Sequence, residues 1–139
     1  TCLIEDFLSQ AKTKGLKICY SAAPFVAEQT SALISITDLL IVNEGEAESL
    51  SEFIKKDITK LALPHLIITL GSKGARYVGE QGSFSIAPFD VNVVDTTGAG
   101  DTFMAAHIAA EIEGMTRPKA LEFAQKTAAA YVAGDDNYV

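Results

Sequence analysis

Short, continuously apolar segments alternate along this chain with segments of helical periodicity, and this alternation constrains the fold more than any other feature. Two of the apolar runs, residues 39–42 and 66–68, contain no polar residue. Such runs are typical of strands that are buried on both faces of a sheet. Strands of this kind joined by helices form a mainly parallel sheet that helices cover on both faces. The sequence therefore predicts an α/β fold.

The remaining elements follow from the spacing of apolar residues. Helices are expected over roughly residues 3–11, 26–35, 46–56, 98–113 and 118–133. Extended segments are expected over residues 17–22, 38–43, 66–70 and 91–94, with a β-hairpin formed by residues 75–78 and 83–87. The aromatic residues expected in the core are Phe7, Phe25, Phe53, Phe103, Phe123 and Tyr131. No internal repeat or linker is evident, so we expect one α/β domain over residues 1–139.

Composition limits the partners of the chain. Its 139 residues carry a formal net charge of −7, which disfavours binding to nucleic acid or to an anionic membrane. No apolar run approaches the roughly 20 residues that span a bilayer. Cys2 and Cys19 lack the spacing of metal ligands, which favours a reduced, cytoplasmic protein. His65 and His107 also lack ligand partners at a suitable spacing. Because the chain opens without methionine and inside an expected helix, we expect it to be a piece of a longer protein.

The most informative motif is Asp95-Thr-Thr-Gly-Ala-Gly-Asp101, which follows an expected strand and opens an expected helix. Gly98, Ala99 and Gly100 let their N–H groups approach an anion at the positive end of the helix dipole. Asp101 adds a carboxylate in the first turn, where it is suited to orient and deprotonate an incoming hydroxyl. The pattern predicts phosphoryl transfer to an alcohol. The alternative is an ordinary N-capped, glycine-rich helix start.

Two further polar clusters follow apolar strands. In Asn43-Glu-Gly-Glu46, Asn43 can donate to phosphate oxygens and Glu46 can hold Mg²⁺ through water, although a helix cap explains the same pattern. In Thr69-Leu-Gly-Ser-Lys-Gly74, a glycine-rich turn lets Ser72 and Lys73 approach a nucleotide, or is a plain turn before the hairpin. Sheets of this class bind ligands at the carboxyl ends of their strands, where all three clusters fall.

In this order, the three clusters resemble the ribokinase-like carbohydrate kinases, also called the PfkB family. Residues 95–101 are similar to the C-terminal signature of that family, residues 43–46 to its N-x-x-E motif, and residues 69–74 to its nucleotide-binding T-x-G turn. The resemblance covers nearly the whole chain and implies a ribokinase-like fold. It also implies ATP-dependent transfer of the γ-phosphate to a sugar hydroxyl, with Mg²⁺ bridging the phosphates.

The resemblance implies a role for each matching residue. Asp101 corresponds to the catalytic base, and Gly98, Ala99 and Gly100 correspond to the anion hole. The residues expected to contact the nucleotide are Asn43, Thr69, Gly71, Ser72, Lys73, Gly74 and Thr127. The residues expected to hold metal ions are Glu46, Asp95 and Thr97, the last two in a loop that holds K⁺ in many family members.

This chain also departs from the family pattern. The sugar-binding region and the lid strands, which precede these motifs in the family, are not present, so the resemblance implies a partial fold. The residues after Ala133 do not match the usual cation loop. The acceptor stays open between a sugar and another small alcohol such as a nucleoside. The family often forms homodimers through the lid, so a homodimer is implied only for the full-length protein.

A non-catalytic nucleotide-binding module is the alternative from a different functional class. The carboxylate of Asp101 argues against it, because a pure binding module has no need of an acid beside a phosphate site. A third possibility is a piece that is inert by itself because half of its core is absent.

Overall fold

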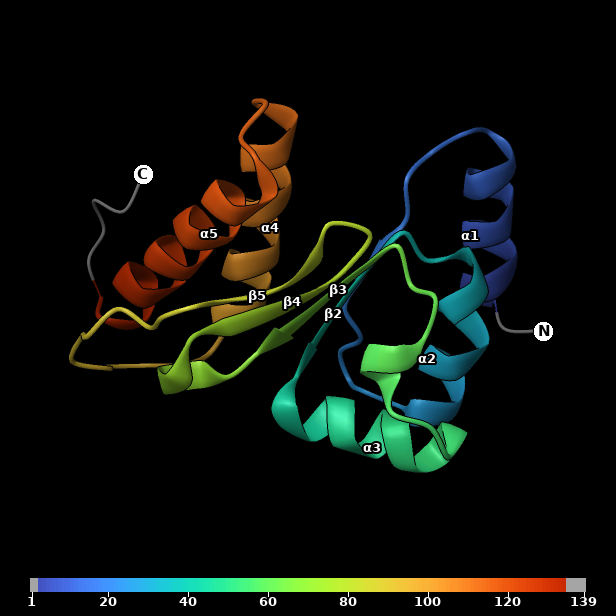
Figure 1. The fold of residues 1–139 in the computed structure, drawn as a ribbon, viewed down its shortest axis with the longest axis horizontal. Coiled ribbons are helices and arrows are strands. Elements are labelled where there is room, and N and C mark those ends of the chain that lie inside the picture. The colour runs from blue at the N-terminus through green and yellow to red at the C-terminus, as the bar shows by residue number, and fades with distance from the viewer. Residues whose placement is uncertain (1–2, 135–139) are drawn as a thin grey trace. The chain divides into compact units, whose positions relative to one another are not determined.

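The computed structural model describes residues 3–134 (Figure 1). Within that range the helices are α1 (Leu3–Thr13), α2 (Ala27–Leu33), α3 (Glu44–Ile54), α4 (Ala99–Ile112) and α5 (Arg117–Val132). The strands are β1 (Cys19–Tyr20), β2 (Leu39–Asn43), β3 (His65–Thr69), β4 (Ala75–Gly79) and β5 (Gly82–Ile86). Short 3₁₀ turns span Ile34–Ile36, Ile58–Lys60 and Gly71–Lys73. Cys2 and the residues after Gly134 lie outside this range. None of the helices described is both long enough and apolar enough to cross a membrane.

Most expected elements are present within a few residues of their predicted ends, with two exceptions. The segment predicted over residues 17–22 is a strand only at β1, and directly before it the N–H of Ile18 donates to the Asp38 side chain. The segment predicted over residues 91–94 is not a strand. There the N–H of Val94 donates 2.7 Å to the carbonyl of Val132, so it is bound by a helix end rather than by a sheet.

The five strands form one sheet in the order β1-β2-β3-β4-β5. β1 and β2 are parallel, with Cys19 opposite Leu39 and Tyr20 opposite Leu40. β4 and β5 are consecutive strands joined by the two-residue turn 80–81, as expected for a hairpin. The sheet is therefore mixed and is flanked by helices, which confirms the predicted α/β class.

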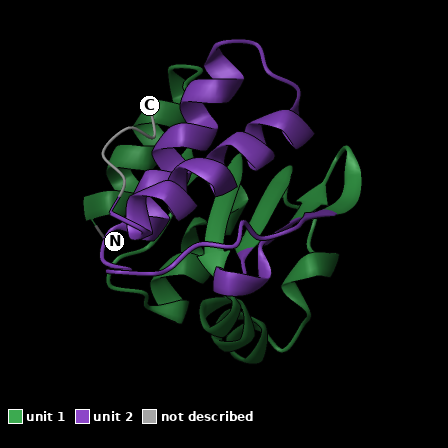
Figure 2. Cartoon of the chain, turned by 90° about the vertical axis from the view of Figure 1, so that its left-hand side faces the viewer, with its two compact units in different colours: residues 1–68, 77–84 green, residues 69–76, 85–139 purple. Residues whose placement is uncertain are grey.

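The chain divides into two compact units (Figure 2). Unit 1 comprises residues 1–68 and 77–84, and unit 2 comprises residues 69–76 and 85–139. The cluster at Asn43 and Glu46 belongs to unit 1, whereas the turn at residues 69–74 and the loop at residues 95–101 belong to unit 2. The single-domain organisation of the chain stays a prediction.

The core of unit 1 is built on β2 and β3. Residues 39–42 are at most 4% exposed, and the next residue, Asn43, is exposed. Leu50 of α3 and Ile67 of β3 are completely buried. The expectation that the aromatic residues lie in the core was wrong for Phe7, Phe53 and Phe123, which are 69%, 51% and 37% exposed. Helical periodicity identified the apolar face of each helix, but not whether another element covers it.

Asp38 joins the segment before β1 to the start of β2. Its Oδ2 accepts a hydrogen bond of 2.7 Å from the N–H of buried Ile18, and its Oδ1 accepts one of 2.5 Å from Lys12 Nζ. Partial burial would raise the pKa of Asp38, but the bonds from Lys12 and Ile18 outweigh it and lower the pKa overall. The ionised carboxylate therefore stabilises this corner above the ordinary pKa of an aspartate, and the contribution is lost in acid.

The turn between β3 and β4 depends on Gly74. Its N–H donates to Gly71 O at 3.1 Å, and its carbonyl accepts from Leu70 N at 2.8 Å. The φ angle of Gly74 is +96°, and a Cβ at this position would lie 2.0 Å from the backbone oxygen of Ile86. A side chain therefore cannot enter without moving backbone.

We expect Asp38→Ala to lower the free energy of unfolding by about 1.5 kcal/mol, since it leaves the N–H of buried Ile18 without its acceptor. Asp38→Asn keeps an acceptor and loses only the exposed ion pair with Lys12, so its cost is about 0.5 kcal/mol. Urea unfolding of the two variants and the wild type at neutral pH measures both values. Equal losses in the two variants would contradict the assignment of the Ile18 bond as the stronger contact.

We expect Gly74→Ala to destabilise the chain by more than about 2 kcal/mol, because the new methyl group meets backbone rather than a movable side chain. Gly71→Ala is the matched control. Gly71 also has a positive φ, of +57°, but a Cβ there meets nothing within 4 Å, so only backbone strain of roughly 1 kcal/mol is expected. Thermal unfolding of both variants measures the two effects. If Gly71→Ala is the more destabilising change, the predicted clash between a Cβ at position 74 and the backbone of Ile86 is contradicted.

Candidate functional site

The loop that opens α4 presents free backbone donors. Asp95 Oδ1 accepts a hydrogen bond of 2.8 Å from the N–H of Thr97, and Gly98 then takes a left-handed conformation with a φ of +78°. The first N–H groups of a helix have no intrahelical acceptor. Here, the N–H groups of Gly100 and Asp101 make no hydrogen bond to any residue within 3–134. Two unpaired donors at the positive end of a helix fit an anion such as a phosphate.

Asp101 lies in the first turn of α4 with its side chain exposed. The buried face of the same helix begins two positions later, at Phe103, and continues through Ala106, His107 and Ala110. Asp101 is therefore held by a rigid helix but is turned away from the core. A carboxylate in this position can reach a molecule that binds in front of the loop, as the sequence predicts.

Residues at the end of α5 hold this loop in position. The carbonyl of Val132 accepts hydrogen bonds from the N–H groups of Val94 and Asp95, at 2.7 and 3.2 Å. The hydroxyl of Tyr131 lies 3.1 Å from the position that a Cβ of Gly98 would occupy. Tyr131 is half-buried and was expected only as a core residue. Its contact with Gly98 had no signal in the sequence, because it depends on how α5 crosses the loop.

The predicted nucleotide turn forms a 3₁₀ turn over Gly71–Lys73. Gly71, Ser72 and Lys73 are exposed, and Thr69 is half-buried. Gly74 is buried, so its evident role is the close backbone packing described above. A contact between Gly74 and a nucleotide stays a prediction.

Asn43 and Glu46 form a capping box at the start of α3. Asn43 Oδ1 accepts from Glu46 N at 2.9 Å, and Glu46 Oε2 accepts from Asn43 N at 2.8 Å. The capping alternative raised by the sequence is therefore present. It uses one side-chain oxygen of each residue and leaves the Asn43 amide nitrogen and Glu46 Oε1 outside the two bonds.

The remaining predicted residues are Asp95, Thr97 and Thr127. Hydrogen bonds from Thr97 lower the pKa of exposed Asp95, so its carboxylate is ionised at neutral pH. Thr127 donates its hydroxyl to the Phe123 carbonyl of its own helix at 2.8 Å. No group of three His, Cys, Asp or Glu side chains suited to a metal ion occurs within residues 3–134. Roles for Glu46, Asp95 and Thr97 in holding metal ions stay predictions.

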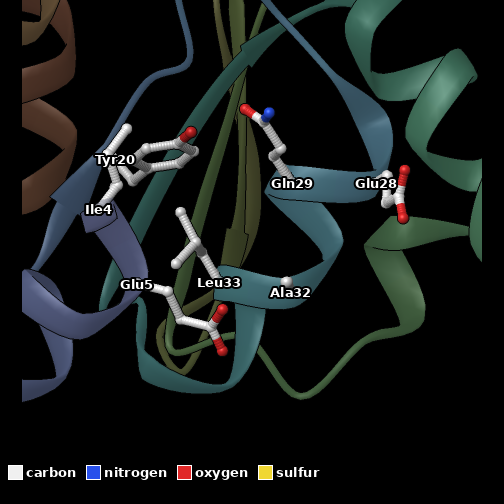
Figure 3. Close-up of a pocket in the computed structure, with 7 residues that line it drawn as sticks. All are labelled: Ile4, Glu5, Tyr20, Glu28, Gln29, Ala32 and Leu33. Carbon is white, nitrogen blue, oxygen red and sulfur yellow. The ribbon is translucent and has the colours of Figure 1, made fainter. Parts of the chain in front are cut away.

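A cavity of about 310 Å³ lies elsewhere, in unit 1 (Figure 3). Its lining residues come from α1, β1 and α2 and are Ile4, Glu5, Tyr20, Glu28, Gln29, Ala32 and Leu33. None of the site residues predicted from the sequence lines it. The predicted chemistry therefore concerns exposed loops and not this cavity.

Comparison with known proteins supports the resemblance. The family model described as pfkB family carbohydrate kinase matches residues 3–135. Ribokinase from Haemophilus influenzae is 34% identical over 130 residues, which cover 86% of this chain and 42% of that protein. Ribokinase from Schizosaccharomyces pombe is 32% identical over 140 residues, which cover 91% of this chain and 44% of that protein. The chain thus spans less than half of the length of these curated relatives.

A crystal structure of a ribokinase II candidate from E. coli, in complex with ATP and Mg²⁺, matches with a TM-score of 0.80 and 26% identity. The match covers 94% of this chain and 46% of that chain. The structural match confirms a partial ribokinase-like fold, as predicted from the sequence. Because the family model matches every residue that the structure describes, the chain belongs to the pfkB family of carbohydrate kinases.

Proposed function

We propose that the protein carrying this chain transfers the γ-phosphate of ATP to a hydroxyl group of a sugar. Family membership supports the reaction class. The observation that carries the proposal is the start of α4, where the unpaired N–H groups of Gly100 and Asp101 stand beside the exposed Asp101 carboxylate. An anion site and a base on one helical turn are what transfer of a phosphoryl group to an alcohol requires.

In this proposal, Asp101 accepts the proton of the acceptor hydroxyl as the hydroxyl oxygen bonds to the γ-phosphorus. The bond between that phosphorus and the bridging oxygen of ADP breaks, and ADP leaves with the electron pair. Backbone N–H groups of Gly98, Gly100 and Asp101 stabilise the charge on the phosphoryl oxygens. The N–H of Ala99, also expected in the anion hole, instead donates to the carbonyl of Thr96 at 3.1 Å. Because the transition state is loose, positioning and charge stabilisation supply most of the catalysis.

ATP and Mg²⁺ are the proposed cofactors, supported by the matching structure that contains both. Mg²⁺ would neutralise charge on the β- and γ-phosphates. From this chain, Ser72 and Lys73 in the exposed turn would contact the nucleotide, together with Thr69 and Gly71 and, on α5, Thr127. Asn43 and Glu46 would act on the metal and phosphates through the atoms outside the capping bonds. Since the chain has a net charge of −7, these local donors must bind ATP against the overall field.

The proposal extends to the molecule that accepts the phosphoryl group and to the conditions under which the protein works. Relatives named ribokinase favour a sugar. A nucleoside is the second candidate, because a nucleoside kinase of Methanocaldococcus jannaschii matches with a TM-score of 0.72 and 27% identity over 79% of this chain and 38% of that chain. The proposal also includes a K⁺ ion near Asp95 and Thr97. It further includes a cytoplasmic location, a homodimer of the full-length protein, and no nucleic-acid or membrane partner.

We expect Asp101→Asn to keep the affinity for ATP within about threefold and to reduce turnover by roughly a thousandfold, because the amide cannot accept the proton. Calorimetric titration with a non-hydrolysable Mg-ATP analogue and a coupled assay with a panel of sugars and nucleosides measure the two effects. Asp90→Asn, which changes another exposed carboxylate of unit 2, is the control and should keep full turnover. Unchanged turnover in Asp101→Asn would rule out the assignment of the base.

We expect Glu46→Gln to raise the Mg²⁺ concentration needed for half-maximal activity by at least about threefold, with little loss of stability. Glutamine keeps an acceptor for the capping bond to Asn43 N, so only the charge is removed. Glu48→Gln on the same helix is the control, since Glu48 is exposed. Urea unfolding checks that the two variants are equally stable. If they are, and if both need the same Mg²⁺ concentration, Glu46 caps α3 but does not act on the metal ion.

A further inference from the structure

His107 is a buried ionisable residue that the proposed reaction does not use. It is fully buried on the face of α4 that packs against α5. Its ring stacks on that of Phe103, with centroids 6.4 Å apart and 8° between the planes. Neither of its ring nitrogens makes a well-aligned hydrogen bond within residues 3–134. Buried polar atoms nearly always have such a partner, so an imidazole in this place needs an explanation.

Two charged side chains face this imidazole. Glu111, one turn further along α4, places its Oε1 3.3 Å from His107 Nε2. Arg117, the first residue of α5, donates from its Nε to the same Oε1 at 2.5 Å. One carboxylate oxygen therefore lies between an imidazole of α4 and a guanidinium of α5. These three side chains, called here the His107 cluster, join the end of α4 to the start of α5.

Burial lowers the pKa of His107, because it disfavours the charged ring, and the charge of Arg117 acts in the same direction. Glu111 and the backbone of Ala120 favour the charged ring and offset this only in part. The imidazole is therefore neutral at neutral pH. A histidine whose pKa falls on folding stabilises the fold above its unfolded pKa of about 6.5, and this contribution is lost progressively as the pH falls below that value.

We propose that His107 is a positioning residue. Its neutral imidazole, packed between Phe103 and Glu111, helps to hold α4 against the start of α5, and protonation of the buried ring in acid weakens the packing of these two helices. The consequence for catalysis rests on the proposed phosphoryl transfer. α4 is continuous from Ala99 to Ile112, so a change at its far end alters how its first turn is presented. Phe103, which stacks on His107, follows Asp101 by two positions in the chain.

An alternative is that His107 only fills core volume. In that case any neutral side chain of similar size would behave like histidine at every pH. The positioning role instead predicts a link between pH, stability and turnover that depends on proton uptake by this one ring.

The test uses His107→Gln in the protein that carries this chain, because glutamine stays neutral on acidification. Urea unfolding and phosphotransfer are measured at about pH 7.5 and about pH 5.5, on either side of the unfolded pKa of histidine. On acidification, the unfolding equilibrium constant should rise, and kcat should fall, at least about threefold more in the wild type than in His107→Gln. An equal acid response in His107→Gln and the wild type would overturn the proposal.

Titration of the His107 ring followed by NMR supplies a second measurement, which needs no activity and no substitution in the core. Glu111→Gln removes a charge that favours the protonated ring, so the pKa of His107 should fall further below that in the wild type. An unchanged titration would overturn the coupling within the His107 cluster. If the wild type shows no phosphotransfer at either pH, the proposed function fails, while unfolding and NMR still decide whether the cluster responds to acid.

Discussion

Burial of β2 and β3 is the constraint on which the rest of unit 1 depends. A strand such as residues 39–42, at most 4% exposed, has no face left for water, so helices and other strands must cover it on all sides. Polar groups can then appear only where the strand stops. Asn43 is exposed directly after four buried residues, and Thr69 is half-buried at the end of β3. The same burial that fixes the sheet therefore decides where polar side chains are available for binding.

This constraint explains how much the sequence could predict. Continuously apolar runs identified β2 and β3, and apolar spacing identified α4 and α5, because both patterns record burial that is local in the chain. The position of Asp101 in the first turn of a helix followed from the glycines before it. Segment 91–94 had apolar residues but was not a strand, because the end of α5 took its N–H group. The exposure of Phe7, Phe53 and Phe123 could not be predicted either, since periodicity does not say whether another element covers a helix face.

Side-chain contacts show why the rest could not be predicted. By sequence, Asn43 and Glu46 fit a capping box as well as the phosphate network that the family resemblance implies, and the capping bonds use one oxygen of each side chain. Tyr131 was expected only as a core residue, and His107 was noted only as lacking ligand partners at a suitable spacing. The contact of Tyr131 with Gly98 appears only once α4 and α5 have packed, because it joins residues far apart in the chain. The pair of His107 and Glu111 is local to α4, but the bond from Arg117 of α5 to the same Glu111 oxygen again depends on helix packing. Long-range contacts of this kind leave no spacing in the sequence.

The loop of residues 95–101 consequently takes part of its geometry from helices α4 and α5. Its start is bound by Val132 and its left-handed Gly98 rests against Tyr131, both from the last turn of α5. The opposite end of the same pair is joined through Glu111 and Arg117. Because Val132 and Tyr131 hold the start of this loop, a change in how α4 packs along α5 moves the donors of Gly100 and Asp101 with it. Residues two to three helical turns from the phosphate site, such as His107 and Glu111, are thus as much part of its architecture as the glycines themselves.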